Sequence, residues 1–400
     1  MMLSKTSFVD INKRGKKKIV LFGSGNISKK TIRKLGKKAI AFIVDNSANL
    51  QGTEYEGLKV NSPKVLSNNY LVLICSTAVR EISTQLEEMG LEPNLDFLIS
   101  PILNDLLAIE ELELLSKTLY FTSGSVAEDR PLAGGGLYKC FINTLEVKVE
   151  KVYSGPCYGA TKVNGLIYFI DTDKGIHTFS KENGIEFKCE LPLGSRAHGI
   201  SYNKFNNNFY VTCSYLDAVL EINSDNWKIE RNFKLSNKID NTGEPMHHCN
   251  DNWSIDNSLF VSMFSSTGNW KLDAFDGCIA EFDLITGERL RDVKNDLYMP
   301  HNIMVLEGML HVLDSLSGHL RFNNFSIQGT FPAFTRGLSY SEGLYFIGQS
   351  KNRNYSKVMG LSNNISIDCG IVVFNPELKA SRFIQLPYSI GEIHSIVIQD

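Results

Sequence analysis

One five-residue motif constrains the fold of this chain more than any other feature. The motif is Met299-Pro300-His301-Asn302-Ile303, and it recurs in degenerate form at residues 156–160, 196–200, 248–251, 334–338 and 392–396. Each copy opens a run of residues typical of a β-strand, and turn pairs such as Asn164-Gly165 follow these runs. Repeats spaced by about 35 to 58 residues are typical of the blades of a β-propeller.

The segments between the motifs predict a six-bladed β-propeller over residues 118–400. Four strand-like runs follow the motif at 196–200, which is the content of one blade. The last motif, at 392–396, lies too close to the end of the sequence to open a blade of its own. Residues 119–123, 136–142 and 147–152 form three strand-like runs with no motif before them. We therefore predict that the C-terminal strand completes this first blade and closes the ring.

This half of the chain also resembles an uncharacterised bacterial family of propeller-like proteins, known only as a domain of unknown function. The resemblance rests on His248-Cys249-Asn250, Met299-Pro300-His301 and the runs 334–338, 347–351 and 369–371. It implies a propeller fold and brings no activity with it.

Residues 1–100 predict a Rossmann-like α/β domain. A strand at 18–22 leads into a Gly-rich turn, a helix at 29–35 and a second strand that ends at Asp45. In dinucleotide-binding units such a turn approaches a phosphate, and a carboxylate in the place of Asp45 binds a ribose. The sequence thus predicts a nucleotide or nucleotide-sugar site at Gly23, Ser24, Gly25, Asn26, Ile27 and Asp45. Ser28 replaces the third glycine of the fingerprint, which makes NAD a weaker candidate.

The same domain resembles the nucleotide-sugar-binding domain of bacterial sugar N-acetyltransferases and related proteins of glycan gene clusters. The resemblance is carried by the Gly-rich turn, by Val44-Asp45-Asn46 and by the runs 52–57 and 61–63. It implies a nucleotide-sugar ligand, and a domain that has lost its ligand and serves in assembly is the alternative. Apolar residues at helical spacing predict a linker helix over residues 101–117.

The six motifs would place a ring of polar side chains at one mouth of the propeller channel. The ring holds Tyr158, His198, Asn250 with His248 beside it, His301, Arg336 and His394. Neutral imidazoles close together are typical ligands of Zn, Mn, Fe and Ni. We therefore predict a divalent transition metal bound by His198, His248, Asn250, His301 and His394. The histidines at 198, 301 and 394 would lie on alternate blades, and channel-wall residues without a metal are the alternative.

Three residues near this ring are the predicted catalytic groups. Tyr158 is a candidate acid or base, Arg336 a clamp for a carboxylate or phosphate, and Asp251 a group that orients a ligand or water. Long loops at 124–135, 265–277 and 350–368 would form the rim of the pocket. They carry Arg130, Trp270, Lys271, Lys351, Arg353 and Tyr355, a mixture that suits an acidic sugar, a sugar phosphate or a partner protein.

Composition limits the remaining possibilities. A net charge of -3 gives no overall field that would attract nucleic acid. Eight cysteines without a CxxC pair predict reduced thiols in a cytoplasmic protein. No apolar run approaches the ~18 residues of a membrane span.

Together these features predict a metal-dependent bacterial enzyme that acts on a sugar or nucleotide-sugar in surface-polysaccharide biosynthesis. The expected chemistry is that of a lyase, epimerase or hydrolase at the channel mouth. Two alternatives stay open. One is a non-catalytic propeller that binds a glycan or protein and has a ligand-sensing Rossmann domain, and the other is an NAD-dependent oxidoreductase. Assembly into a homo-oligomer is compatible with each of them.

Overall fold

The chain divides into two compact units. The computed structural model describes residues 3–14, 17–144, 146–272, 274–351 and 366–399. Residues Met1–Leu114 form one unit and Leu115–Asp400 the other. The residues predicted as a linker, 101–117, are thus divided between the two units. No helix in these described ranges is long and apolar enough to cross a membrane. All eight cysteines are free, and seven of them are buried.

The N-terminal unit is a small α/β domain built on one six-stranded sheet. Its strand order is β3-β4-β2-β1-β5-β6, and all neighbours are parallel except β3 and β4. The strands are β1 (Lys18–Phe22), β2 (Ile40–Val44), β3 (Glu54–Tyr55), β4 (Leu58–Asn61), β5 (Tyr70–Ile74) and β6 (Phe97–Ile99). The helices are α1 (Phe8–Lys13), α2 (Asn26–Leu35), α3 (Val79–Glu88) and α4 (Asn104–Glu113).

The central strands of this sheet are apolar on both faces because helices cover both faces. Ile19 and Leu21 of β1 pack in the same cluster as Ile32 of α2. Val20 and Phe22 point to the opposite face, in a cluster that also holds apolar residues of α3 and α4. A parallel sheet buried on both sides requires such continuous apolar runs, which is why β1 could be located from the sequence.

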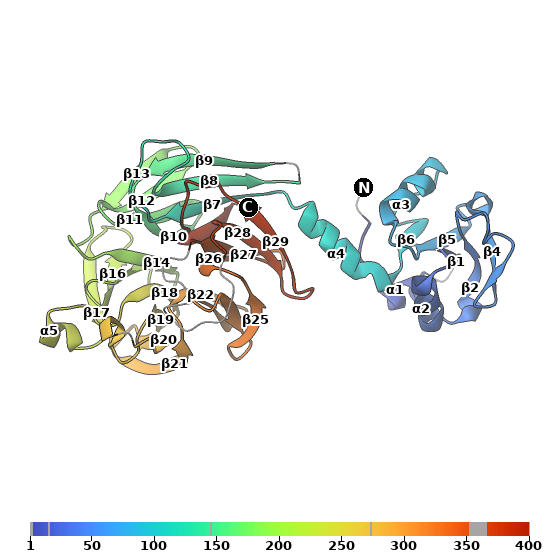
Figure 1. Ribbon diagram of the computed structural model, residues 1–400. Helices are drawn as coiled ribbons and strands as arrows, with labels where there is room; N and C mark the ends of the chain where they lie inside the picture. Colours follow the sequence, from blue (N-terminus) through green and yellow to red (C-terminus); the bar gives the residue numbers. More distant parts are fainter. Residues whose placement is uncertain (1–2, 15–16, 145, 273, 352–365, 400) are drawn as a thin grey trace. The chain divides into compact units, whose positions relative to one another are not determined.

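The C-terminal unit is a propeller of six four-stranded antiparallel sheets (Figure 1). Five of the sheets use consecutive strands. These are β10 (Cys157–Val163), β11 (Leu166–Asp171), β12 (Gly175–Ser180) and β13 (Gly184–Cys189); β14 (Ala197–Asn203), β15 (Asn208–Cys213), β16 (Ala218–Asn223) and β17 (Ile229–Lys234); β18 (Cys249–Ile255), β19 (Ser258–Met263), β20 (Gly277–Asp283) and β21 (Arg289–Leu297); β22 (Pro300–Leu306), β23 (Met309–Asp314), β24 (His319–Phe322) and β25 (Ser326–Thr330); and β26 (Phe334–Ser341), β27 (Leu344–Ser350), β28 (Gly370–Asn375) and β29 (Ala380–Gln385). A short helix, α5 (Lys238–Thr242), lies between β17 and β18.

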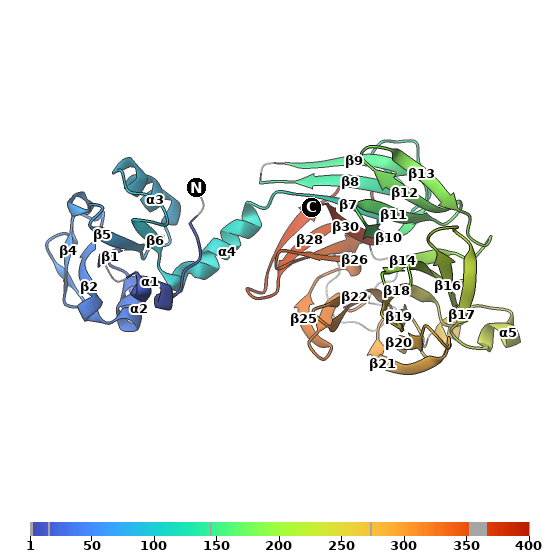
Figure 2. The same ribbon diagram turned by 180° about the vertical axis from the view of Figure 1, so that it is seen from behind.

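The sixth sheet closes the ring with both ends of this unit. Its order is β30-β7-β8-β9, in which β30 (Ser395–Gln399) comes from the C-terminus, and β7 (Lys117–Ser123), β8 (Gly136–Ile142) and β9 (Val147–Ser154) come from the start of the unit. Ile396 pairs with Phe121 in the antiparallel ladder between β30 and β7, and the two strands lie side by side in Figure 2. The predicted six-bladed propeller, closed by its last strand, is confirmed.

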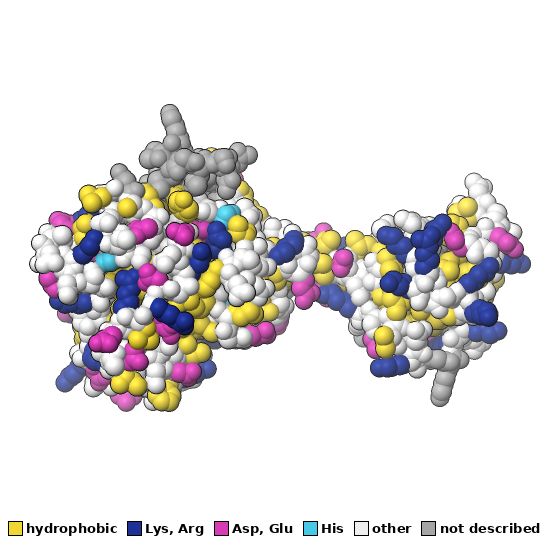
Figure 3. Space-filling model, turned by 90° about the horizontal axis from the view of Figure 1, so that it is seen from below, with side chains coloured by type: hydrophobic (Ala, Val, Ile, Leu, Met, Phe, Trp, Pro, Cys, Tyr) yellow, Lys and Arg dark blue, Asp and Glu magenta, His cyan; other side chains and the backbone are white. Residues whose placement is uncertain are grey.

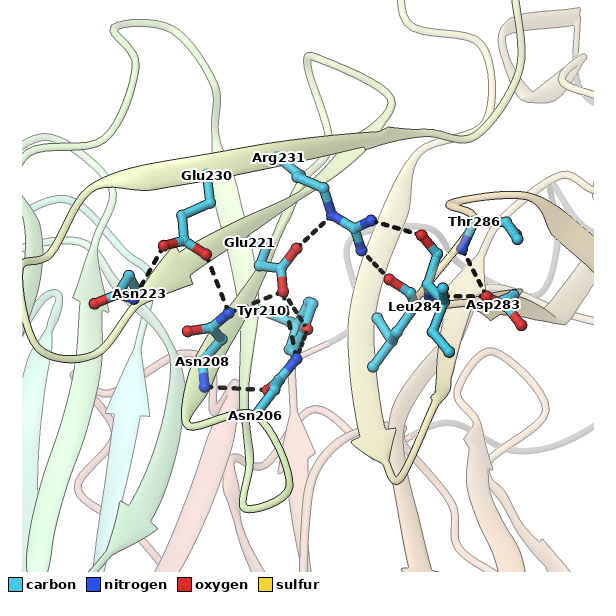
Figure 4. Close-up of polar contacts among 11 residues, drawn as sticks. Asn206, Asn208, Tyr210, Glu221, Asn223, Glu230, Arg231, Asp283, Leu284 and Thr286 are labelled. Carbon is cyan, nitrogen blue, oxygen red and sulfur yellow. Dashed lines mark hydrogen bonds and ion pairs between the residues drawn. The ribbon is translucent and has the colours of Figure 1, made fainter.

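Polar side chains join neighbouring blades near their outer edges (Figure 4). Arg231 of β17 donates from Nε to Glu221 Oε2 at 2.7 Å, from NH1 to the carbonyl of Ile285 at 3.0 Å, and from NH2 to the carbonyl of Leu284. Tyr210 also donates to Glu221, at 2.7 Å. One guanidinium group therefore links the sheet β14–β17 to the turn between β20 and β21 in the next sheet.

Candidate functional site

A cavity of about 210 Å³ lies where the inner strands of the propeller begin. Its described lining is Tyr158, Arg196, His198, His248, Phe264, Trp270, Met299, His301, Phe334, Arg336, Lys351, Glu392 and His394. Four histidines, two arginines, a lysine and a tyrosine thus meet at one end of the channel. The predicted residues Tyr158, His198, His248, His301, Arg336 and His394 all belong to this lining, whereas Asn250 and Asp251 do not.

The backbone at the strand starts is irregular, and this irregularity aims the side chains into the cavity. Strands β10, β14, β18, β22 and β26 each show a break in pairing register within their first residues. Arg196, His248 and Met299 directly precede β14, β18 and β22, and their φ angles are 47°, 54° and 51°. The left-handed region is sparsely populated by residues other than glycine. Bulges and left-handed residues bend a strand and redirect its side chains, and such strained residues cluster at functional sites.

The imidazole rings form a close group around Tyr158. The centroid of the Tyr158 ring lies 4.6 Å from that of His198 and 4.1 Å from that of His394. His198 lies 5.7 Å from His248 and 6.0 Å from His394, centroid to centroid. His301 lies between Phe264 and Phe334, at 5.4 Å from each ring. His198, His248 and His394 therefore share one side of the cavity, and His301 has an aromatic surrounding.

Burial keeps three of the histidines neutral at neutral pH. Desolvation, with smaller contributions from the neighbouring histidines and arginines, lowers the pKa of His198 and of His301 well below the usual range. Desolvation also lowers the pKa of His248 to about 3, with Arg196 adding to the effect. A neutral imidazole has one nitrogen that accepts a proton or a hydrogen bond. The cavity therefore holds three buried neutral imidazoles, each with one nitrogen that can accept a hydrogen bond.

Arg336 provides a fixed positive charge against these neutral rings. Its NH1 lies 3.0 Å from Nε2 of His394, and its NH2 donates to Glu392 Oε2 at 2.9 Å. A guanidinium group only donates hydrogen bonds, so Nε2 of His394 is the accepting nitrogen and the ring carries its proton on Nδ1. Ser125 donates to the other oxygen of Glu392 at 3.2 Å.

The same contacts limit how the histidines could bind a metal ion. Nε2 of His394 directs its lone pair at Arg336, and Nδ1 of His301 lies 2.9 Å from both the Met299 carbonyl and Ser315 Oγ. Among the described residues, no three His, Cys, Asp or Glu side chains are placed to hold one ion. The predicted metal at His198, His248, Asn250, His301 and His394 stays a prediction, with Arg336 competing for one of its ligands.

Three buried polar atoms of residues that line the cavity have no hydrogen-bond partner in the part of the chain that the structure describes. They are Nε2 of His198, Nε1 of Trp270 and Nε of Arg336, and all three are buried. A buried polar atom without a partner costs about 1–3 kcal/mol, and such atoms are rare in folded proteins. Three such atoms among the residues around one cavity make this cavity the leading candidate for a binding site.

Asn250 and Asp251 belong to the channel wall beneath the mouth. Asn250 Nδ2 donates to the Pro300 carbonyl at 3.2 Å. Asp251 lines a second cavity of about 90 Å³, and its Oδ2 accepts from Asn302 Nδ2 and from the Ile303 N–H, both at 3.2 Å. Desolvation raises the pKa of Asp251 to about 7. In the sheet β18–β21 it is His248, and not Asn250, that lines the mouth cavity.

Some of the residues that form the site were not predicted as site residues. Arg196 and Glu392 each precede a ring histidine by two residues, and this spacing was the available signal. Trp270 and Lys351 come from two of the predicted rim loops, and both reach the cavity. Arg130 instead pairs with Glu128 within its own loop, and Lys271 pairs with Glu244. Arg353 and Tyr355 lie outside the described residues.

In the Gly-rich turn of the N-terminal domain, where the sequence predicts a nucleotide, the carboxylate of Asp45 occupies the hydrogen-bond donors of Ser24. Asp45 Oδ2 accepts from the backbone N–H of Ser24 at 2.8 Å and from its hydroxyl at 2.7 Å. Gly25 is the residue before α2 (Asn26–Leu35), and its carbonyl accepts from Tyr55 at 3.0 Å. Gly23 has a φ of 106°, which requires a glycine, and Ile27 packs on the core. A phosphate would have to replace Asp45 at Ser24, so nucleotide binding here stays a prediction.

Comparison with known proteins identifies one family model. Residues 15–94 match the model described as C2185-like, N-terminal, and this match lies within the N-terminal α/β unit. It does not concern sugar acetyltransferases, so the resemblance to their nucleotide-sugar domain stays a prediction. No curated protein is found to match the chain.

Several solved structures are similar to this chain at low identity. A protein of unknown function from Bacteroides caccae is 16% identical with a TM-score of 0.46, and the match covers 71% of this chain and 99% of that one. A luciferin-regenerating enzyme is 11% identical with a TM-score of 0.41, covering 61% and 91%. An auxiliary nutrient binding protein from Bacteroides thetaiotaomicron is 12% identical with a TM-score of 0.39, covering 59% and 74%. At these values the comparisons carry no conclusion about activity.

Proposed function

We propose that the mouth cavity binds a small anionic sugar and that its histidine and tyrosine side chains move protons on that sugar. One observation carries the proposal: three residues that line the cavity each have a buried side-chain nitrogen without a partner among the described residues, and these nitrogens are Nε2 of His198, Nε1 of Trp270 and Nε of Arg336. Indole and guanidinium N–H groups can only donate. A ligand that satisfies them must therefore offer acceptor oxygens, as carboxylates, phosphates and sugar hydroxyls do.

The charge of the lining favours an anion. Arg196, Arg336 and Lys351 are cationic, and Glu392 is the one carboxylate among the described lining residues. Because burial keeps His198, His248 and His301 neutral, the fixed charges leave the cavity positive. Charge-assisted hydrogen bonds from arginine to a carboxylate or phosphate are among the strongest available in proteins.

The size and the aromatic content of the cavity narrow the ligand class. At about 210 Å³ the cavity is smaller than the roughly 300–1,000 Å³ of sites for drug-sized molecules. A monosaccharide fits this space better than a whole nucleotide-sugar. Phe264, Trp270 and Phe334 offer apolar faces beside the polar groups, which matches the alternation of C–H and hydroxyl groups on a sugar ring.

The proposed chemistry is proton abstraction from the carbon next to a carboxylate. Arg336 would hold the carboxylate, His198 Nε2 would take the proton, and the electron pair of the C–H bond would move onto the carboxylate oxygens beside the guanidinium. The negative charge of the ligand would raise the pKa of His198 toward neutrality. Tyr158, whose ring contacts both His198 and His394, would return a proton in an epimerisation. In an elimination the β-substituent would leave instead.

In this proposal Arg336 supplies the positive charge for which the sequence predicted a metal ion. The lyase or epimerase class predicted from the sequence is retained, and a role in surface-polysaccharide synthesis stays a prediction. Elemental analysis of the untagged protein tests this point. About one transition metal per chain, lost in His198→Gln, would favour the metal-dependent mechanism over the one proposed.

Binding is tested by calorimetric titration of the full chain with glucuronate, galacturonate and glucose 6-phosphate, with glucose as the neutral control. At least one anionic sugar should bind, glucose should not, and Trp270→Phe should weaken binding about five-fold because it removes one N–H donor and keeps an aromatic ring. Arg336→Gln should weaken it about 30-fold or more. Arg130→Gln is the matched control, because that side chain is 73% exposed and lies outside the cavity.

Catalysis is tested separately from binding by NMR in heavy water. For a uronate that binds, the hydrogen next to the carboxylate should exchange for deuterium, or an unsaturated product should appear. His198→Gln should stop this exchange and leave the binding constant within about three-fold, as expected when a group acts only in the chemical step. Tight binding of a uronate with no exchange and no product would favour the alternative of a non-catalytic binding propeller.

A further inference from the structure

The N-terminal domain contains a long basic stretch that the mouth cavity does not use. Residues 11–44 include eleven lysines and arginines and no aspartate or glutamate. The chain as a whole has a net charge of -3, so this stretch is a strong local departure from the average. Its middle part is the helix α2 (Asn26–Leu35).

The cations of α2 lie on the side that faces away from the domain core. Ser28, Thr31 and Ile32 are buried against the domain. Lys30, Arg33 and Lys34 are exposed and follow the spacing i, i+3 and i+4, which places them on one stripe of α2. Lys37 and Lys38 are exposed in the short 3-10 turn (Lys37–Ala39) that follows the end of the helix.

The helix α1 (Phe8–Lys13) extends this charged surface. Its residue Ile11 packs in the same core cluster as Ile32 of α2, so the two helices lie side by side. Lys13 and Val9 of α1 are exposed, and Val9 retains 61% of its side-chain exposure. We use the term basic face for Lys13, Lys30, Arg33, Lys34, Lys37 and Lys38. Figure 3 shows Lys and Arg side chains gathered on this domain.

Few carboxylates lie beside the basic face: Asp10 interacts with Lys13 through its charge, and Glu56 interacts with Arg33 in the same way. Lys17 pairs with Asp96 at 2.6 Å and Lys29 with Glu56 at 2.6 Å, so these two lysines are not counted in it. Lys13, Lys30, Arg33, Lys34, Lys37 and Lys38 make no ion pair with any residue that the structure describes. Like charges at i, i+3 and i+4 destabilise a helix. These repelling cations have few carboxylates nearby to offset their repulsion, so the surface is suited to an anionic partner.

We infer that the basic face docks the protein on a bilayer that contains anionic lipids. Lysines near such a surface attract its phosphates without precise geometry, and an exposed apolar residue such as Val9 can enter the interface between them. Five of the six cations of the basic face are lysines. Groove recognition in nucleic acids relies more on arginine, and binding of single strands relies on exposed aromatic rings. The exposed large apolar residues of this domain are Val9, Leu50, Val65, Met89, Leu95, Ile109 and Leu114, none of them aromatic.

Co-sedimentation of the full chain with lipid vesicles tests the inference. The probes are vesicles of phosphatidylcholine alone and vesicles of phosphatidylcholine mixed with phosphatidylglycerol, each at low and high salt. We expect binding only to the anionic vesicles, with a partition coefficient that falls as salt screens the charges. The variant Lys30→Gln/Arg33→Gln/Lys34→Gln should lower this coefficient about 100-fold, since each cation near an anionic surface contributes roughly a five-fold factor.

A matched variant and a competing polyanion make the result decisive. Lys181→Gln/Lys204→Gln/Lys228→Gln removes three exposed lysines of the propeller and should leave vesicle binding unchanged. If both variants lost vesicle binding equally, net charge alone would explain the binding, and the inference would be overturned. Equal binding to neutral and anionic vesicles, or no binding to anionic vesicles at low salt, would overturn it as well. Duplex DNA that binds more tightly than the anionic vesicles, through the same three residues, would make nucleic acid the partner and also overturn it.

Discussion

Asp251 gives the propeller a pH dependence of stability that one substitution should remove. Burial beneath the mouth raises the pKa of this carboxyl from 3.8 to about 7. Between these values the folded protein holds a proton that the unfolded chain has released. The free energy of unfolding therefore falls as pH rises through this window, and stability that is fully present below the unfolded pKa is lost by the time the folded pKa is passed.

The size of the effect follows from the pKa difference. At ~1.4 kcal/mol per pKa unit, the full cost of ionising Asp251 is about 4 kcal/mol, and more than half of it falls between pH 5 and pH 8. Asn in its place does not ionise, and its side-chain oxygen can still accept from Asn302 and from the Ile303 N–H. Asp251→Asn should therefore be more stable than the natural protein by about 4 kcal/mol at pH 8 and by clearly less at pH 5.

Urea unfolding followed by tryptophan fluorescence measures this difference in the right part of the chain. The three tryptophans are at 227, 253 and 270, all within the propeller unit. The natural protein, Asp251→Asn and the surface control Asp225→Asn would be compared at pH 5 and pH 8. A stability gap between the natural protein and Asp251→Asn that is the same at both pH values would refute the reasoning, because it would mean that this carboxyl does not change its protonation over the range.

Two further predictions concern packing between blades. Gly199→Ala should lower the free energy of unfolding by about 3 kcal/mol, because the new Cβ would lie 2.7 Å from the Asp251 Cα; Gly391→Ala, where nothing lies within 4 Å, is the control, and equal urea midpoints for the two variants would contradict the prediction. Arg231→Gln should cost about 1–2 kcal/mol through the bonds it loses to Glu221, Leu284 and Ile285, which are partly exposed to water. Lys148→Gln, at a side chain that is 69% exposed, should cost almost nothing, and a similar loss there would show that Arg231 acts by charge alone.

The propeller could be predicted from the sequence because its repeat is punctuated at the same point in each blade. Met299-Pro300-His301 and its relatives mark the start of β14, β18, β22, β26 and β30, and the missing first strand before residue 119 implied the closure by β30. The predicted ring could not be exact, because pairing breaks at the start of five of the six inner strands, β10, β14, β18, β22 and β26. In β18 the break in pairing follows Cys249. His248, which has a left-handed backbone conformation, lines the cavity there in place of Asn250.

The side-chain contacts within the site could not be predicted from the sequence, for a different reason. Arg336 reaches His394 and Glu392, which lie 56 or more residues later in the chain. This contact depends on side-chain directions at the irregular start of β26 and in the residues just before β30. In the N-terminal domain, the order of strand, turn, helix and strand was readable from apolar runs. Whether Asp45 would face a ligand or close the turn onto Ser24 was not readable, since both arrangements need the same residues at the same spacing.

The closure by β30 also sets the order in which this protein can mature on the ribosome. Chains emerge N-terminus first, and domains fold as units while synthesis continues. The α/β domain can therefore fold early, whereas β7 must wait for its partner Ser395–Gln399, which is translated after every other strand. Glu392 and His394, which complete the mouth, arrive with the same segment. A nascent chain stalled before this point has an open ring and no finished pocket, so translation of β30 is the step that completes the mouth cavity.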